Sequence, residues 1–449
     1  MLRNGNAYTR RRIAPEKVSR SLKVLEKQVV PTNNAGHPRN QENRTVLVFF
    51  PWNLYPPNVG SRQRCLEMIA GLKEIGFNVI LASSNLDLKW DTSSIRFMRM
   101  NGVSEIYVFD PPTLDYWFRL ILYTRAFSYL YQNFYFIGRD ILPRMRRWFF
   151  KILQKISPDI ILMNYPSWNW ILNHRKFKSA LRVIDTHDIF TLHMQMRQHL
   201  NQYFLGSPPY SIKGVRDEVF EEDFFEKLDL TVNANEFEIY DKYDYTIGIS
   251  LKEAEIMKKN TRNTKVLFVP MTGKPAYIKN SYRGRALFSA GPHPFNIQGY
   301  LYFVGKVLPR VKSKAPLFNL QVTGGISNYV VHVKDISFSE YIPDLSTVYE
   351  SARFFVCPVF GGTGQQVKII EAMAHGIPVV AFRKAPGVFP IQNGLNGLIA
   401  RNAEEFADYV VQLWNDRELC RRLGQAARDT IAADFSRSRL VKALSLALQ

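Results

Sequence analysis

The residues 354–382 constrain the fold more than any other part of this chain, because they are typical of one strand–loop–helix–strand unit. An apolar run opens the stretch and another closes it, each with the length and composition of a buried strand. Three glycines mark a loop between them, and a helix is expected from about Gln365 to His375, ended by a glycine and a proline. Crossover units of this kind place their two strands parallel in one sheet.

The loop and the helix after it offer groups that suit a nucleotide. A glycine loop before a helix, here containing Gly362, Thr363 and Gly364, presents backbone N–H groups and the positive end of the helix dipole to an anion. Lys368 adds a positive charge just inside that end, and Glu371 can accept two hydrogen bonds from a diol such as a ribose. The alternative is a plain glycine turn followed by a core helix, with Lys368 and Glu371 as a solvated pair.

These residues also resemble a known motif. From Pro358 to Val380 the chain is in register with P-x-x-x-G-x-G-x-x-x-K-x-x-E-A-M-A-x-G-x-P-V-V, the nucleotide-sugar motif of group 1 (family 4-like) GT-B glycosyltransferases. The resemblance implies that Glu371 binds the ribose of the donor and that Lys368 lies on its phosphate side. In many members a glutamate that touches the donor sugar stands where this chain has Thr363.

The first predicted strand, 46–50, also leads into a loop and a helix. The loop is rich in proline, the helix is expected over 61–75, and a second strand follows at 79–82. The pattern resembles the opening of the same enzymes, in which Gly60 would let the backbone approach the donor and Arg62 would lie beside it. The loop follows the carboxyl end of a strand, where open α/β sheets bind ligands.

The apolar run 181–185 ends in polar residues that include His187 and Asp188. Such a pair can be structural or can cap a helix. Related enzymes have a His-Asp pair at this strand end that faces the donor sugar, so the resemblance implies that His187 and Asp188 lie at the reacting centre.

Another apolar run ends at Gly291, and a helix is expected after it. The segment resembles the family pattern in which Gly291 approaches the donor phosphates and Asn296 lies near the cleft. Many members have an arginine and a lysine here for the diphosphate, but GPHPFNIQGY has neither. The positive charge must come from elsewhere, with Lys368, Arg62 and Lys306 as candidates.

Composition limits the class of protein and its partners. The chain has 449 residues, 46% of them hydrophobic and 22% charged, which is typical of two or three globular domains. Three widely spaced cysteines favour a reducing compartment and indicate neither a disulfide framework nor a zinc site. No apolar run of about 18 residues and no secretory signal is apparent. The net charge of +20 favours an anionic partner, which could be a nucleic acid, an acidic membrane surface or a phosphorylated substrate.

Aromatic residues and arginines alternate over 112–153. This composition suits helices packed on the first domain with arginines in solvent, an interfacial membrane or lipid-acceptor region, or a surface for single-stranded nucleic acid. The density of bulky apolar side chains favours membrane over nucleic acid.

The expected fold class is α/β with GT-B architecture, in which two Rossmann-like domains with parallel sheets face a cleft. Two helices from Ala403 are expected to finish the chain. The expected parts are a flexible basic arm (1–43, with surface attachment as the alternative), an N-terminal acceptor-side domain (44–270), a linker (271–285), a C-terminal nucleotide-sugar-binding domain (286–430) and a terminal helix that returns to the first domain (431–449).

The resemblance implies a glycosyltransferase that moves a sugar from a nucleotide-sugar donor to a glycan or lipid-linked acceptor in surface-polysaccharide or glycolipid assembly. It implies retention of anomeric configuration and no metal or other cofactor. The expected location is cytoplasmic, at the inner face of an anionic membrane. A catalytically silent scaffold of the same fold is the alternative, and a nucleic-acid-binding protein is a weaker one.

Overall fold

The structure is a computed structural model that describes residues 44–111, 143–277, 279–339, 342, 346–383 and 390–448. The predicted arm (1–43) and most of the aromatic and basic stretch (112–142) lie outside the described residues.

The first domain is built on apolar runs that alternate with helices along the chain. Its strands are β1 (Thr45–Phe49), β2 (Asn78–Ser84), β3 (Val103–Phe109), β4 (Ile160–Asn164), β5 (Leu181–Asp185), β6 (Tyr245–Gly248) and β7 (Lys265–Phe268). They form one parallel seven-stranded sheet in the order β3-β2-β1-β4-β5-β6-β7. Residues 46–50 are fully buried, which explains why this run shows no polar alternation.

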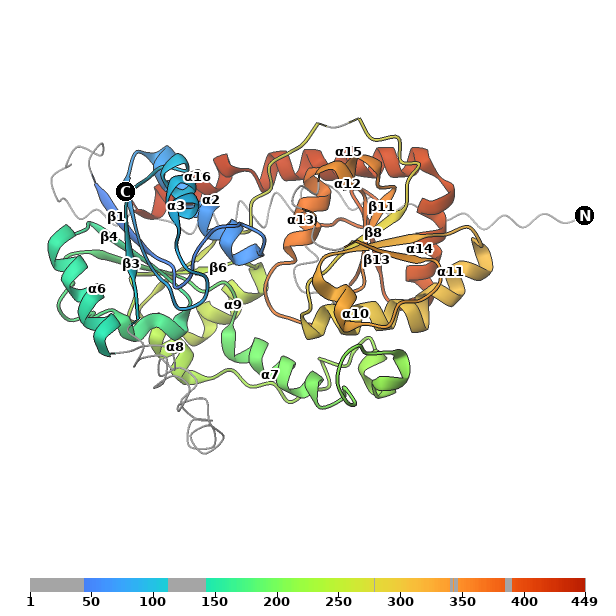
Figure 1. The fold of residues 1–449 in the computed structure, drawn as a ribbon, viewed down its shortest axis with the longest axis horizontal. Helices are drawn as coiled ribbons and strands as arrows, with labels where there is room; N and C mark the ends of the chain where they lie inside the picture. The colour runs from blue at the N-terminus through green and yellow to red at the C-terminus, as the bar shows by residue number, and fades with distance from the viewer. Residues whose placement is uncertain are drawn as a thin grey trace, which may run out of the picture. The chain divides into compact units, whose positions relative to one another are not determined.

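Helices cover both faces of this sheet (Figure 1). They are α2 (Gly60–Ile75), α3 (Thr92–Met100), α6 (Pro143–Ile156), α8 (Ala234–Tyr240) and α9 (Leu251–Asn260), whereas α7 (Phe190–Asn201) leads from this domain towards the second (Figure 1). The predictions of a helix over 61–75 and of a strand over 79–82 are confirmed.

The second domain repeats this plan. Its strands are β8 (Ala286–Ser289), β9 (Leu320–Thr323), β10 (Ile336–Ser339), β11 (Phe354–Cys357), β12 (Val379–Phe382) and β13 (Leu398–Ala400). They form a parallel six-stranded sheet in the order β10-β9-β8-β11-β12-β13. The strands predicted at the two ends of 354–382 are therefore parallel neighbours, as expected.

The helices of this domain are α10 (Pro294–Tyr302), α11 (Leu308–Lys314), α12 (Ser346–Ser351), α13 (Val367–Ala374), α14 (Ala403–Asn415), α15 (Arg417–Asp434) and α16 (Arg437–Leu448). A π-helical turn at 303–307 joins α10 to α11. The expectation that two helices finish the chain after Ala403 is wrong, because α15 ends at Asp434 with Phe435 as its C-cap and a third helix, α16, begins at Arg437.

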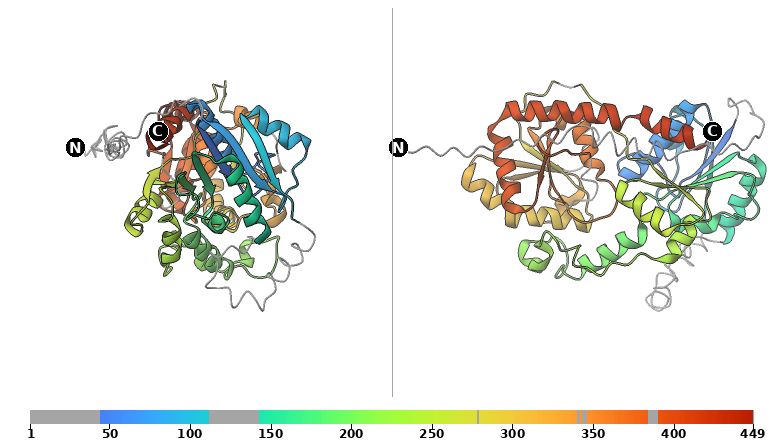
Figure 2. Two further views of the ribbon diagram at one scale, coloured as in Figure 1. Left: turned by 90° about the vertical axis from the view of Figure 1, so that its left-hand side faces the viewer. Right: turned by 180° about the vertical axis from the view of Figure 1, so that it is seen from behind.

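The last helix returns to the first domain. Leu440 and Leu444 of α16 are buried in the same core as the residues of α2, and Arg44 donates a hydrogen bond of 2.7 Å to the backbone O of Leu448. Figures 1 and 2 show α15 and α16 running from the second sheet towards α2.

The segment after α7 packs on the second domain although it precedes β6 in the chain. The ring of Phe225 lies 5.4 Å from that of Phe295, and Gln298 donates a 2.8 Å hydrogen bond to the backbone O of Val219. Together with α7, this segment connects the two cores along one side of the molecule (Figure 1).

Candidate functional site

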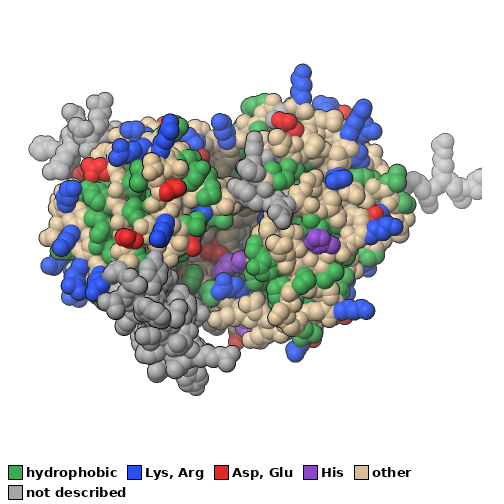
Figure 3. Space-filling view, viewed as in Figure 1, with side chains coloured by type: hydrophobic (Ala, Val, Ile, Leu, Met, Phe, Trp, Pro, Cys, Tyr) green, Lys and Arg blue, Asp and Glu red, His purple; other side chains and the backbone are tan. Residues whose placement is uncertain are grey.

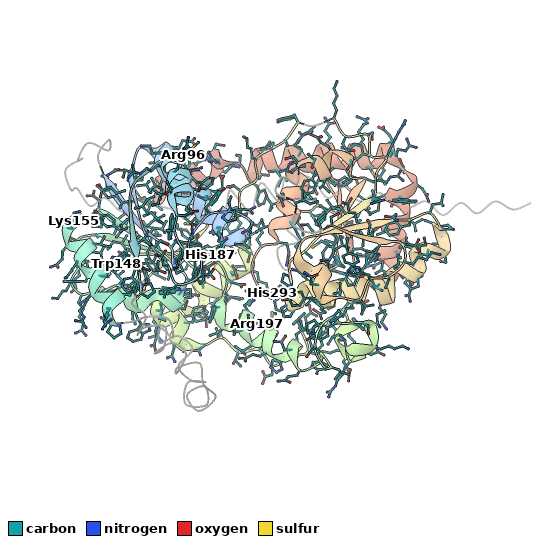
Figure 4. All side chains as sticks on the ribbon, in the orientation of Figure 1. Arg96, Trp148, Lys155, His187, Arg197 and His293 are labelled. Carbon is teal, nitrogen blue, oxygen red and sulfur yellow. The ribbon has the colours of Figure 1, made fainter. Side chains whose placement is uncertain are left out.

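The predicted site residues follow strands at the point where the strand order of each sheet reverses, or, for His187 and Asp188, one strand away from it. This point is between β1 and β4 in the first sheet and between β8 and β11 in the second. Parallel sheets bind ligands at such points because successive loops leave to opposite faces and open a crevice. Figure 3 shows acidic, basic and histidine side chains gathered in a hollow of the surface, and Figure 4 labels His187 and His293 in this region.

The glycine loop after β11 lies against the first domain. Gly362 has a φ of 113°, a left-handed conformation that favours glycine. Thr363 donates a 3.0 Å hydrogen bond from Oγ1 to Oε1 of Glu253 in α9. A Cβ added to Gly364 would lie 3.4 Å from the backbone O of His187 and 3.8 Å from Cγ of Asp188, so the loop passes close to this strand end.

The helix after this loop begins at Val367, two residues later than expected. A Cβ added to Gly60, the first residue of α2, would lie 2.7 Å from Cγ2 of Val367. The N-termini of α2 and α13 therefore approach each other, one from each domain. Both helices direct the positive ends of their dipoles into the same region.

Three of the predicted donor residues form one chain of hydrogen bonds. Lys368 donates from Nζ to Oδ1 of Asn296 over 2.7 Å, and Asn296 donates from Nδ2 to the backbone O of Gly291 over 3.0 Å. Burial lowers the pKa of Lys368, whose Nζ also lies 5.1 Å from the ring centre of Phe288. A Cβ added to Gly291 would meet nothing within 4 Å, so open space lies beside its backbone.

Glu371 lies one turn further along α13 and is half-buried. Burial raises the pKa of its carboxyl, which is 3.4 Å from the hydroxyl of Tyr349. The ring of Tyr349 stacks on the ring of His375 with centroids 4.5 Å apart, and this contact helps to fix the position of the tyrosine.

His187 has a strained backbone and a defined ring. Its φ is 62°, which is uncommon for a residue other than glycine. Its Nε2 lies 2.7 Å from Oδ1 of Asn164, whose Nδ2 donates to the backbone O of Phe49. Asn164 is therefore an acceptor for the imidazole, which assigns the hydrogen to Nε2 and leaves Nδ1 as an acceptor.

The environment of this ring favours its neutral form. It stacks on Tyr165 with centroids 4.2 Å apart. Burial lowers the pKa of His187 to about 4, although Asp185 acts in the opposite direction. Asp185 itself is bound in a bidentate pair by Arg64, with N–O distances of 2.7 and 2.9 Å. The carboxylate of Asp185 is therefore buried in an ion pair with Arg64.

Asp188 belongs to a group of polar residues between α7 and α9. Its Oδ2 lies 2.5 Å from Nδ1 of His193. Burial, and then the charge and hydrogen bond of Asp188, raise the pKa of Glu253 well above its usual value. Glu253 also accepts a hydrogen bond from the backbone N of Ile189. Sequence reasoning missed both Glu253 and His193, because neither belongs to a strand-end pattern.

Arg62 lies near the site, and its described contacts are with its own loop. It donates to the backbone O of Pro56 and to Oδ1 of Asn58, and lies 3.7 Å from Asp87. Lys306, another residue considered for the diphosphate, lies 5.9 Å from the ring centre of Phe220. The structure thus brings His187, Asp188, Gly60 and the glycine loop together, and joins Lys368, Asn296 and Gly291. Among the described residues, no group of three or more His, Cys, Asp or Glu has an arrangement that could hold a metal ion.

Comparison with known proteins finds a family match in the second domain. Residues 284–416 match the family model described as glycosyl transferases group 1. A protein of Haemophilus influenzae, described as an uncharacterized glycosyltransferase, is 27% identical over 210 residues, which are 43% of this chain and 58% of that protein. The alignment therefore spans less than two thirds of this relative.

Solved structures share the fold along most of the chain. Sucrose-phosphate synthase of Thermosynechococcus elongatus superposes with a TM-score of 0.59 at 14% identity, covering 90% of this chain and 98% of that one. HepE of Anabaena in complex with UDP-glucose has a TM-score of 0.56 at 12% identity, with 90% and 99% covered. The pneumococcal O-GlcNAc transferase GtfA in complex with UDP and GlcNAc has a TM-score of 0.58 at 9% identity, with 90% and 98% covered. The predicted GT-B fold and the resemblance to group 1 glycosyltransferases are confirmed.

Proposed function

We propose that this chain, whose residues 284–416 match the group 1 glycosyl transferases, moves a sugar from a nucleotide-sugar donor to a glycan or lipid-linked acceptor. The observation that carries the proposal is the approach of the glycine loop to the polar strand end of the first domain, where Gly364 lies against His187 and Asp188. A phosphate at the loop would hold the attached sugar beside these two residues.

The donor would bind to the second domain through charge and hydrogen bonds. The loop and the N-terminus of α13 favour binding of the diphosphate. Lys368 adds a positive charge, and the group to which it donates a hydrogen bond, the amide of Asn296, is neutral. Glu371, half-buried beside Tyr349, would accept hydrogen bonds from the ribose. The complexes of HepE with UDP-glucose and of GtfA with UDP support a nucleotide donor.

His187 would orient the sugar as a neutral imidazole. Because its pKa is about 4, the ring is uncharged at neutral pH. Its Nε2–H donates a hydrogen bond to Oδ1 of Asn164. Its Nδ1 is then free to accept a hydrogen bond from a sugar hydroxyl. Departure of the diphosphate would be stabilised by the dipole of α13 and by positive side chains. We expect retention at the anomeric carbon, which NMR of the product tests.

Release of nucleoside diphosphate from a panel of nucleotide sugars, with and without glycan or lipid acceptors, tests the activity. Replacing Glu371 by Ala should weaken nucleotide binding by about tenfold or more, because hydrogen bonds to a charged group are worth about 1.5–3 kcal/mol. The control is Glu350→Ala, an exposed glutamate at the end of α12. Equal affinity in the Glu371 variant would place the nucleotide elsewhere.

A catalytically silent binding protein is the second candidate. Thr363 stands where related enzymes have a carboxylate, and its hydroxyl is bound to Glu253. Binding of nucleotide sugars without hydrolysis or transfer to any acceptor of the panel would favour this candidate.

The acceptor side and the location are also proposals. We propose that the chain works in surface-polysaccharide or glycolipid assembly at the inner, anionic face of a membrane, to which it would bind peripherally. The exposed arginines of α6 support this location. None of the described helices is both long enough and apolar enough to cross a membrane.

A further inference from the structure

Helix α7 brings two basic residues of the first domain to the second. His193 and Arg197 are four residues apart and therefore share one face of the helix. The ring of His193 lies 5.3 Å from the rings of His293 and Phe295, at the start of α10. This face of α7 therefore lies against the N-terminus of α10, and Figure 4 draws Arg197 beside His293.

The charges that meet here have no acidic partner. Arg197 is half-buried and forms no hydrogen bond or ion pair with any other residue that the structure describes. Lys368 makes its hydrogen bond to a neutral amide. The charges of both Arg197 and Lys368 act on His293 and help burial to lower its pKa to about 3. Since both charges act on the same imidazole and neither has an ion-pair partner among the described residues, they favour an anion beside it.

Arg62 and Lys306, the other candidates for binding the diphosphate, make their described contacts with other groups. Arg62 is bound by the loop before α2, and Lys306 lies over the ring of Phe220. Arg197 reaches this region from the first domain, because its charge acts on His293, which lies between Gly291 and Asn296 in the chain.

We infer that Arg197 binds the diphosphate of the nucleotide-sugar donor, opposite Lys368, and so supplies the cation that the loop after β8 lacks. The inference rests on the proposed function. A guanidinium can bind two phosphate oxygens at once, which suits a diphosphate better than a point charge. Each domain would then hold the leaving group with one cation. Because His193 of the same helix contacts Asp188, α7 would also link the phosphates to the reacting centre.

Isothermal titration calorimetry of the full chain with UDP, GDP, ADP and CDP, and with the nucleoside of the tightest ligand, tests the inference. Replacing Arg197 by Gln should weaken diphosphate binding on the order of tenfold to a hundredfold, as for the loss of a charged hydrogen bond. Binding of the nucleoside without phosphates should not change. Arg197→Lys keeps the charge but loses the paired contact. Its affinity for the diphosphate should therefore lie between those of the unmodified chain and of Arg197→Gln. Arg175→Gln, at an exposed turn of the first domain, removes the same charge and should bind like the unmodified chain.

Each other outcome overturns the inference in a recognisable way. Unchanged diphosphate affinity in both Arg197 variants would overturn it and leave the proposed function standing. Equal loss of nucleoside and diphosphate binding would show that Arg197 maintains the fold or the base site instead. If the unmodified chain binds none of the four diphosphates, the proposed function fails and the inference fails with it.

Discussion

Glu253 is the side chain that joins the glycine loop to the first domain. Its Oε1 accepts hydrogen bonds of 3.0 Å from the backbone N of Ile189 and from Oγ1 of Thr363. Its Oε2 and Oδ1 of Asp188 are both buried and have no other partner among the described residues. Burial and Asp188 raise the pKa of Glu253 well above its usual value. We therefore expect this carboxyl to keep a proton that it can donate to Asp188.

Replacing Glu253 by Gln should therefore leave the free energy of unfolding at neutral pH within about 1 kcal/mol of the unmodified value, because an amide reproduces one donor and one acceptor. Glu253→Ala is the matched comparison and should cost about 1–3 kcal/mol, since two donors and Asp188 lose their partner. Urea denaturation measures both values. If the Gln variant is as unstable as the Ala variant, the glutamate is ionised and the assignment of the proton is wrong.

His174 shows how burial makes stability depend on pH at one residue. Its Nε2 lies 2.7 Å from Oδ1 of Asn169, and its ring packs edge-on against Tyr243 at 4.8 Å. Burial, and then the charges of Arg182 and Lys242, lower the pKa of His174 to about 4. In the unfolded chain a histidine has a pKa of about 6.5.

As the pH falls from about 6.5 to about 4, the unfolded state takes up a proton at His174 that the native state does not bind, so stability is lost in this window. Above it, neither state binds the proton. His174→Gln removes this dependence, so the free energy of unfolding of the unmodified chain should fall by roughly 3 kcal/mol relative to the variant between neutral pH and about pH 4. Denaturation curves at a series of pH values measure the difference. Parallel curves would contradict the lowered pKa.

At the scale of elements, local sequence predicts the units that carry their own signals. The unit from β11 to β12 follows from two apolar runs, a glycine loop and a helix stop, and β1, α2 and β2 follow in the same way. The neighbourhood of Asn164 and His187 follows in part, because β4 and β5 are parallel and adjacent, with Asn164 paired to Asp185. Residues at the carboxyl ends of such strands must lie close together.

Contacts between distant parts of the chain have no local signal. Nothing in the pattern of residues 202–230 indicates that they pack on the core of the second domain, because an apolar side chain can be buried by any complementary surface. The place of Arg197 depends on that packing and was missed for the same reason. The late start of α13 was missed because Gln365 and Gln366 suit a helix, whereas Oε1 of Gln365 instead accepts a hydrogen bond from the backbone N of Met271.

The crossing of α13 and α15 depends on a glycine. A Cβ added to Gly424 would lie 2.0 Å from the backbone O of Gly376, and backbone cannot move aside as a side chain can. Gly424→Ala should therefore lower the free energy of unfolding by about 1–3 kcal/mol or more, as overpacking does. Gly291→Ala is the matched control, because its Cβ would meet nothing within 4 Å, and its stability should not change. Thermal unfolding compares the two variants, and equal melting temperatures would contradict the close crossing.

At the scale of the whole molecule, the net charge of +20 must be related to surfaces that a partner can reach. The described part of the aromatic and basic stretch is α6, whose apolar residues Met145, Phe149 and Leu153 are buried in the first domain. This agrees with the interpretation as a helix packed on that domain. Arg144, Arg146 and Arg147 are exposed on the other side. Contact of α6 with a membrane would therefore be electrostatic, without insertion of these apolar side chains.

Replacing Arg144, Arg146 and Arg147 together by Gln should abolish most of the binding to vesicles that contain anionic lipid. Each basic residue near such a surface contributes about 1 kcal/mol, so three amount to on the order of a hundredfold in affinity. Liposome flotation measures the loss, and binding of the unmodified chain should weaken with added salt because the interaction is screened.

The control removes the same charge from the second domain, by replacing the exposed Arg417, Arg421 and Arg422 of α15 with Gln. If binding to the vesicles depended on net charge alone, the two triple variants would lose the same fraction of their binding. Loss confined to the α6 variant would identify the face of the first domain that meets the lipid, and with it the side from which a lipid-linked acceptor reaches His187. Undiminished flotation of the α6 variant would contradict this orientation. A salt-dependent shift of single-stranded RNA by the unmodified chain, without flotation, would favour nucleic acid as the anionic partner.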